Sequence, residues 1–201
     1  MKFVLLVAPL LCLGANIAQA QISQFQHIVV IVQENRTPDN LFQALCAPPF
    51  GNSNSCSTNP TGSQYDIQTS DWLNKTSSTG VTQPLPVSLM AGYDLGHFHA
   101  GFLAMCDKAP GSGVCRMDGA ASIDCYVGIC LSQPQFRYVT NERGILNPYL
   151  TLATQYGWAN YMFQTNQGPS FPAHQFIFGG TSARSAADDA AGIFVADELL
   201  T

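Results

Sequence analysis

One acidic and one amide side chain directly follow an apolar run near the start of the chain. Residues 27–32, His-Ile-Val-Val-Ile-Val, have the β-branched content and length of a strand covered on both faces. Glu34 and Asn35 come next. Because open α/β sheets bind ligands just outside the carboxyl ends of such strands, both side chains are candidate site residues. Their oxygens suit a divalent cation, and a solvated turn after a strand is the alternative.

A serine follows a Gly-Pro pair at residues 168–169. We expect a strand over 158–163, a turn over 165–169 and the start of a helix over 172–178. This order puts Ser170 at or just before a helix N-terminus, where unpaired N–H groups and the positive end of the helix dipole would stabilise an alkoxide or a phosphate oxygen. The alternative is a serine that only caps the helix.

Two histidines and an aspartate complete the candidates. His97 and His99 lie in the otherwise apolar stretch 94–105, which has the pattern of a helix. A lone histidine in such a stretch is more often packed in a core than catalytic. Asp118 precedes Gly119, and a turn role for it is as plausible as a catalytic one.

The remaining elements are read from turn and cap residues. Residues 39–45 could form a short helical turn. Asn147 and Pro148 predict a helix with an asparagine N-cap and a proline at its first position, and Gly157 ends it. The stretch from about 46 to 87 is rich in Gly, Ser, Thr, Asn and Pro, so we expect a loop-rich insertion there.

Composition and the N-terminus indicate an exported protein. Residues 1–20 contain one Lys, an apolar core over 3–13 and Ala18-Gln19-Ala20, which is typical of a secretory signal peptide. The run is too short for a transmembrane segment. A net charge of -5 with 8 Lys plus Arg, none of them clustered, disfavours nucleic-acid binding. We therefore expect a secreted or periplasmic protein that buries a core, since 46% of its residues are hydrophobic.

The chain keeps an even number of cysteines after the signal peptide, which in an exported protein favours disulfides. Their close succession predicts pairing of neighbours, although six cysteines allow 15 connectivities. Metal binding by cysteine is the rival, and the lack of any CxxC pair disfavours it. The six are Cys46, Cys56, Cys106, Cys115, Cys125 and Cys130.

Four blocks together resemble one family. They are Glu34-Asn35-Arg36-Thr37-Pro38-Asp39, Asp94-Leu95-Gly96-His97, Met117-Asp118-Gly119 and Gly168-Pro169-Ser170-Phe171-Pro172-Ala173-His174. Their order and rough spacing resemble the bacterial phosphoesterase family that includes phosphatidylcholine-type phospholipases C and a related acid phosphatase, a branch of the alkaline-phosphatase superfamily. The first and last blocks are the most specific.

The resemblance implies an α/β fold with an alkaline-phosphatase-like sheet flanked by helices. It implies an exported phosphoesterase that uses a divalent metal ion and acts on phosphate esters, either small molecules or phospholipid head groups. Glu34, Asn35 and Ser170 would contact the metal, Ser170 would be the nucleophile that is transiently phosphorylated, and His97 would lie near the phosphate. The phospholipases commonly carry threonine at the position of Ser170, so its serine favours the acid-phosphatase side.

The remaining metal ligands of the family lie in a C-terminal half that this sequence lacks. We therefore expect residues 21–201 to be the N-terminal portion of a phosphoesterase domain, incompletely encoded and inactive alone. Asp188 and Asp189 are expected in a solvated loop or helix start.

Two other functions stay open at this stage. One is a metal-free serine hydrolase that pairs Ser170 with His97, His99 or His174, although the Gly-x-Ser-x-Gly pattern is missing. The other is a disulfide-stapled extracellular binding module without catalysis.

Overall fold

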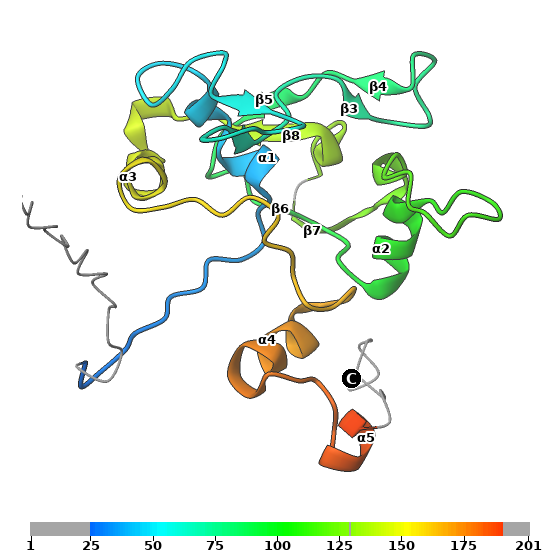
Figure 1. Ribbon diagram of the computed structural model, residues 1–201. Coiled ribbons are helices and arrows are strands. Elements are labelled where there is room, and N and C mark those ends of the chain that lie inside the picture. The colour runs from blue at the N-terminus through cyan, green and yellow to red at the C-terminus, as the bar shows by residue number, and fades with distance from the viewer. Residues whose placement is uncertain (1–24, 129, 191–201) are drawn as a thin grey trace, which may run out of the picture. The chain divides into compact units, whose positions relative to one another are not determined.

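The computed structural model describes residues 25–128 and 130–190 (Figure 1). The chain divides into two units, Met1–Glu34 and Asn35–Thr201. The predicted signal peptide, residues 1–20, lies outside the described residues.

The described part of the first unit, residues 25–34, is extended chain without a helix or strand. Its apolar run is open to solvent, with Val29 82% and Ile31 88% exposed. The predicted buried strand over 27–32 is therefore wrong. Strand propensity only becomes a strand when a neighbour accepts its backbone hydrogen bonds, and no described strand pairs with this run.

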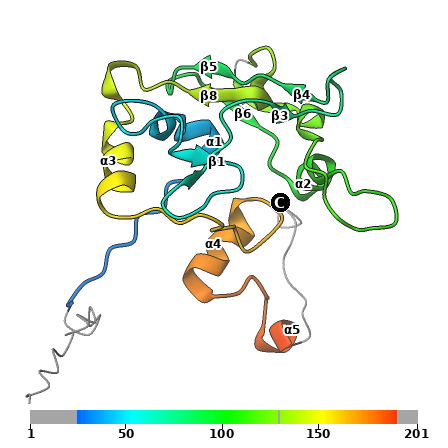
Figure 2. The ribbon, with the colours of Figure 1, turned by 45° about the horizontal axis from the view of Figure 1, so that its top comes forward.

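In the second unit, two segments far apart in sequence pair in parallel: β5 (Leu85–Val87) with β8 (Arg137–Val139). Helix α1 (Pro38–Leu41) lies beside this pair (Figures 1 and 2). It begins at Pro38 because Thr37 Oγ1 accepts the Asn40 N–H over 3.2 Å. A 3-10 turn, η2 (Gln43–Cys46), follows. The expected helical turn over 39–45 is thus present as two short pieces.

Helix α3 (Asn147–Gln155) closes the core over α1 and β8. It starts one residue before the predicted position, with Asn147 in its first turn and Leu146 as N-cap. The asparagine that serves the helix start is Asn141, whose Oδ1 accepts the Leu146 N–H over 2.9 Å. The buried members of this core are Leu41, Leu45, Ile67, Val139, Leu146 and Leu150.

The segment after α3 turns back onto the loop-rich region, and the strand predicted over 158–163 is absent. Trp158 packs edge-on against Phe42, with ring centroids 5.0 Å apart. Its Nε1–H donates to Asn160 Oδ1, which also accepts the Asp66 N–H over 2.8 Å. Asn160 Nδ2 donates to Gln64 O. The prediction failed because these polar side chains bind another loop and leave no room for a ladder of backbone bonds.

The loop-rich stretch carries two pairs of very short strands. β1 (Cys56–Ser57) pairs in parallel with β2 (Tyr65–Asp66), and β3 (Trp72–Leu73) pairs antiparallel with β4 (Val81–Thr82).

A further antiparallel pair joins β6 (Tyr93–Leu95) to β7 (Cys125–Gly128). Helix α2 (His99–Cys106) follows β6, so the predicted helix over 94–105 is a strand, a link and a helix. Three 3-10 turns complete the region: η3 (Ala120–Ser122), η4 (Pro134–Phe136) and η5 (Glu142–Gly144). Helices with small sheets are consistent with an α/β fold.

All three predicted disulfides are confirmed. The bonds are Cys46–Cys56, Cys106–Cys115 and Cys125–Cys130.

The last described elements are α4 (Ser170–Gly179) and α5 (Ala186–Ala190). Gly180 ends α4 with φ 73°, a left-handed conformation that glycine adopts without strain. Asp188 lies in α5, where its N–H donates to Ser185 Oγ and its carboxylate lies 3.7 Å from Arg184. This agrees with the expected helix start.

Candidate functional site

Ser170 is the first residue of α4, two residues before the predicted start, and its side chain is half-buried. The N-cap is Pro169, so Ser170 is not the capping residue. A helix start normally leaves four N–H groups without an intrahelical partner. Two of the four positions here are Pro169 and Pro172, which have no backbone N–H. The two that remain belong to Ser170 and Phe171, and helix geometry directs them out of the start of α4.

His97 lies in the link between β6 and α2. Its Nδ1 is 2.9 Å from Leu95 O and 3.9 Å from Asp94 Oδ2. A carbonyl oxygen only accepts hydrogen bonds, so Nδ1 carries a proton and Nε2 is the nitrogen left for other partners. The side chain is 43% exposed. This is a solvent-facing histidine, and not the core histidine that its apolar surroundings in sequence favoured.

Asn35 and Arg36 connect the first motif to the histidine link. Asn35 has φ 69°, a left-handed conformation that asparagine tolerates better than most residues. The Arg36 guanidinium stacks over the Tyr93 ring, 5.5 Å from its centroid. Tyr93 begins the strand that leads to His97. The Asn-Arg and His97 blocks are thereby brought together.

The histidine link also reaches the serine loop. His99, the first residue of α2, has its Nδ1 2.6 Å from Gln167 O, three residues before Ser170. Sequence reasoning gave this histidine no such role. The signal available was only its spacing of two residues from His97.

Glu34 is the last residue of the first unit, and its side chain is exposed. In donor type, its carboxylate with the Asn35 amide and the Ser170 hydroxyl fits a hard divalent cation. These three groups supply fewer oxygen ligands than the six that such ions bind. Within residues 25–128 and 130–190, no group of three or more His, Cys, Asp or Glu side chains could hold a metal ion.

The Met117-Asp118-Gly119 block has a structural explanation. Asp118 lies 3.9 Å from Arg116 Nε, in a cluster where Lys75 and Arg116 also bind Asp107. The Lys75 hydrogen bond and then the Arg116 guanidinium lower the pKa of the Asp107 carboxyl. A Cβ on Gly119 would lie 1.9 Å from Ala104 O, so only glycine fits against α2 here. The block therefore packs the end of α2.

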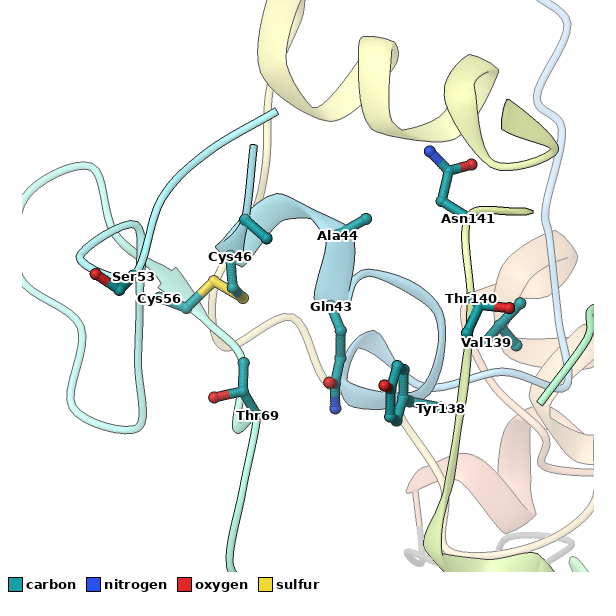
Figure 3. A pocket seen from close by; sticks show the side chains of 11 residues that line it. Gln43, Ala44, Cys46, Ser53, Cys56, Thr69, Tyr138, Val139, Thr140 and Asn141 are labelled. Atoms are coloured by element: carbon teal, nitrogen blue, oxygen red, sulfur yellow. A yellow bond between two sulfur atoms is a disulfide. The ribbon is translucent and has the colours of Figure 1, made fainter. Parts of the chain in front are cut away.

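A cavity of about 440 Å³ lies apart from these residues, around the Cys46–Cys56 disulfide (Figure 3). Its polar lining consists of amides and hydroxyls, with no carboxylate, ammonium, guanidinium or imidazole. A phosphate dianion would find no opposite charge there. The lining residues are Gln43, Ala44, Cys46, Ala47, Ser53, Cys56, Thr69, Tyr138, Val139, Thr140 and Asn141.

The family comparison covers all of the described residues, with the model of the Phosphoesterase family matching residues 25–198. The chain belongs to the Phosphoesterase family. All four motif blocks lie inside the matched range. No curated protein and no solved structure matched the chain.

Membership of the Phosphoesterase family implies a hydrolase that acts on phosphate esters. Three disulfides are compatible with an extracellular protein. None of the helices in the described ranges is long and apolar enough to cross a membrane.

Proposed function

We propose that this protein is an exported, metal-dependent phosphoesterase of the acid-phosphatase type, working through a phosphoserine on Ser170. The observation that carries the proposal is the position of Ser170 as the first residue of α4 in a chain of the Phosphoesterase family. At that position the N–H groups of Ser170 and Phe171 are available to a phosphate oxygen. The exposed imidazole of His97 is the second group of the site.

In the first step, Ser170 Oγ forms a bond to phosphorus and the bond from phosphorus to the leaving oxygen breaks. The serine proton is lost to solvent, and the leaving oxygen takes up a proton. When doubly protonated, His97 donates from Nε2 to that oxygen while Nδ1 stays bonded to Leu95 O. In the second step, water attacks phosphorus, the phosphorus–Oγ bond breaks, and phosphate and free Ser170 result.

Glu34, Asn35 and Ser170 are the proposed metal contacts, supported by their oxygen donors and by the family. A bound divalent cation would favour the ionised serine and offset charge on phosphate. Because these residues supply one carboxylate only, we propose that residues 21–201 alone turn over phosphate esters poorly.

We also propose the alkaline-phosphatase-like architecture for the whole domain. The parallel β5–β8 pair supports it, because a larger parallel sheet would contain such a pair.

The decisive experiment is turnover of an aryl phosphate by the full-length gene product and its Ser170→Ala variant. We expect at least about a hundredfold loss of kcat, with an unchanged thermal transition. Brief reaction with a phosphorus-labelled substrate followed by acid quench should label wild-type Ser170. Retention of more than a few per cent of activity in the variant would exclude the covalent mechanism.

A chelator separates the other two functions. Loss of turnover after chelation, restored by a divalent cation, supports the proposal. Turnover that survives chelation points to a metal-free serine hydrolase. No turnover of any phosphate ester by the metal-loaded full-length protein points to a binding module.

A further inference from the structure

The loop before Ser170 is tied to α2 through one side chain. His99 Nδ1 and Gln167 O are 2.6 Å apart, across 68 residues of sequence. Because the carbonyl oxygen has no proton, His99 Nδ1–H is the donor. The two atoms are therefore within hydrogen-bond distance.

The loop needs such a restraint because of its own composition. Gly168 follows the bonded carbonyl, and glycine lets the chain adopt many conformations. Pro169 then fixes φ at -74° and is buried, so the last step into Ser170 is rigid. Inside the loop, Asn166 Nδ2 donates to Pro169 O over 3.4 Å, which closes the turn only on itself. The His99 bond sets where that turn lies against α2.

The two neighbouring histidines bind different partners through Nδ1. His97 Nδ1 binds Leu95 O, two residues away in its own link, and leaves its imidazole solvent-exposed. His99 Nδ1 binds the serine loop instead. The two histidines, two residues apart, thus present one solvent-facing ring and one ring that is hydrogen-bonded to the serine loop.

We propose that His99 is a positioning residue that sets the place of Ser170 through the Gln167 carbonyl. The inference rests on the proposed function of Ser170 as nucleophile. A displaced nucleophile lowers kcat more than it weakens substrate binding, since small errors in attack geometry cost large factors in rate.

Two isosteric variants of the full-length protein test this. In His99→Asn the amide nitrogen takes nearly the place of Nδ1 and can still donate to Gln167 O. In His99→Gln it takes nearly the place of Nε2 and cannot. We expect His99→Gln to lower kcat on an aryl phosphate by about 10- to 100-fold with little change in KM, and His99→Asn to restore kcat to within about threefold of wild type.

A second measurement does not depend on activity. Amide hydrogen exchange of the peptide spanning 164–170 should speed up in His99→Gln and stay near wild type in His99→Asn. If wild type is inactive or Ser170→Ala keeps its activity, the proposed function fails, and exchange still decides whether His99 holds the loop.

Three outcomes would overturn the proposal for His99. Retained activity in His99→Gln with loss in His99→Asn would show a direct Nε2 contact and overturn the proposal. Equal activity in both variants, at either level, or unchanged exchange in His99→Gln, would also overturn it.

Discussion

Asp39 Oδ1 accepts the backbone N–H of Gln68 over 2.7 Å and so joins α1 to the loop-rich stretch. The carboxyl is half-buried. Burial raises its pKa above the ordinary value of 3.8, the Gln68 hydrogen bond opposes this, and the nearby Asp66 charge adds to it. The net direction is upward, so ionisation of this carboxyl is less favourable in the folded state than in the unfolded chain.

Asp39→Asn should therefore stabilise the fold at neutral pH. A raised folded pKa contributes stability below the unfolded pKa and loses it as pH rises through the folded pKa. Asparagine keeps an oxygen for the Gln68 N–H and removes the charge near Asp66. In thermal melts from pH 3 to 8, the Tm of the variant should rise relative to that of wild type as pH increases above about 4. A lower Tm for the variant than for wild type at pH 7 would contradict this prediction.

Leu150 is fully buried between α3 and the β5–β8 pair, whereas Leu152 on the same helix is 55% exposed. Leu150→Ala should lower the free energy of unfolding by about 3 kcal/mol, because it leaves a cavity in a packed core. Leu152→Ala is the matched control and should cost under about 0.5 kcal/mol. Urea unfolding monitored by fluorescence measures both. An equal loss of unfolding free energy in both variants would show that Leu150 is not packed in the core.

Asn35 can be tested for backbone and side chain separately. Asn35→Ala should destabilise the protein by about 1 kcal/mol, because alanine resists φ 69°. Asn35→Gly adopts that backbone freely and lacks only the amide. If the amide contacts metal and phosphate, both variants should lose phosphatase activity while only the alanine variant loses this stability. Full activity in Asn35→Gly would remove Asn35 from the site.

Glu34→Gln removes the single carboxylate from the proposed metal contacts. We expect at least about a tenfold weaker affinity for divalent cations, measured by calorimetry with Mg²⁺, Ca²⁺, Mn²⁺ and Zn²⁺ on the full-length protein. Glu142→Gln, another exposed glutamate, in η5, is the control and should bind as wild type does. Unchanged affinity in Glu34→Gln would show that the carboxylate is not a ligand.

Local features of the fold could be predicted from the sequence because they depend on near neighbours. The disulfides join cysteines 5 to 10 residues apart, so their succession in sequence was informative. The start of α4 followed from the Gly-Pro pair and the apolar residues after it. Both strand predictions were wrong because a strand needs a partner strand, and the residues of the segment itself do not specify that partner.

The same limit applies to the site. Ser170 and His97 could be chosen by residue type and motif, and the hydrogen bond that fixes His97 lies within two residues. The Arg36–Tyr93 stack and the His99–Gln167 bond link segments 57 and 68 residues apart. Side-chain contacts of that range depend on the packing of loops, which periodicity and turn residues do not encode.

The short disulfide rings determine what a protease can release. A single cut between Cys46 and Cys56, Cys106 and Cys115, or Cys125 and Cys130 opens a ring whose two ends stay covalently joined. The chain then migrates as one band without reductant and as two bands with it. A cut in the exposed turn near Met162 lies outside every ring and yields two separate pieces in either buffer. Comparing the two gels therefore distinguishes a nick inside one of the rings from a nick outside all of them.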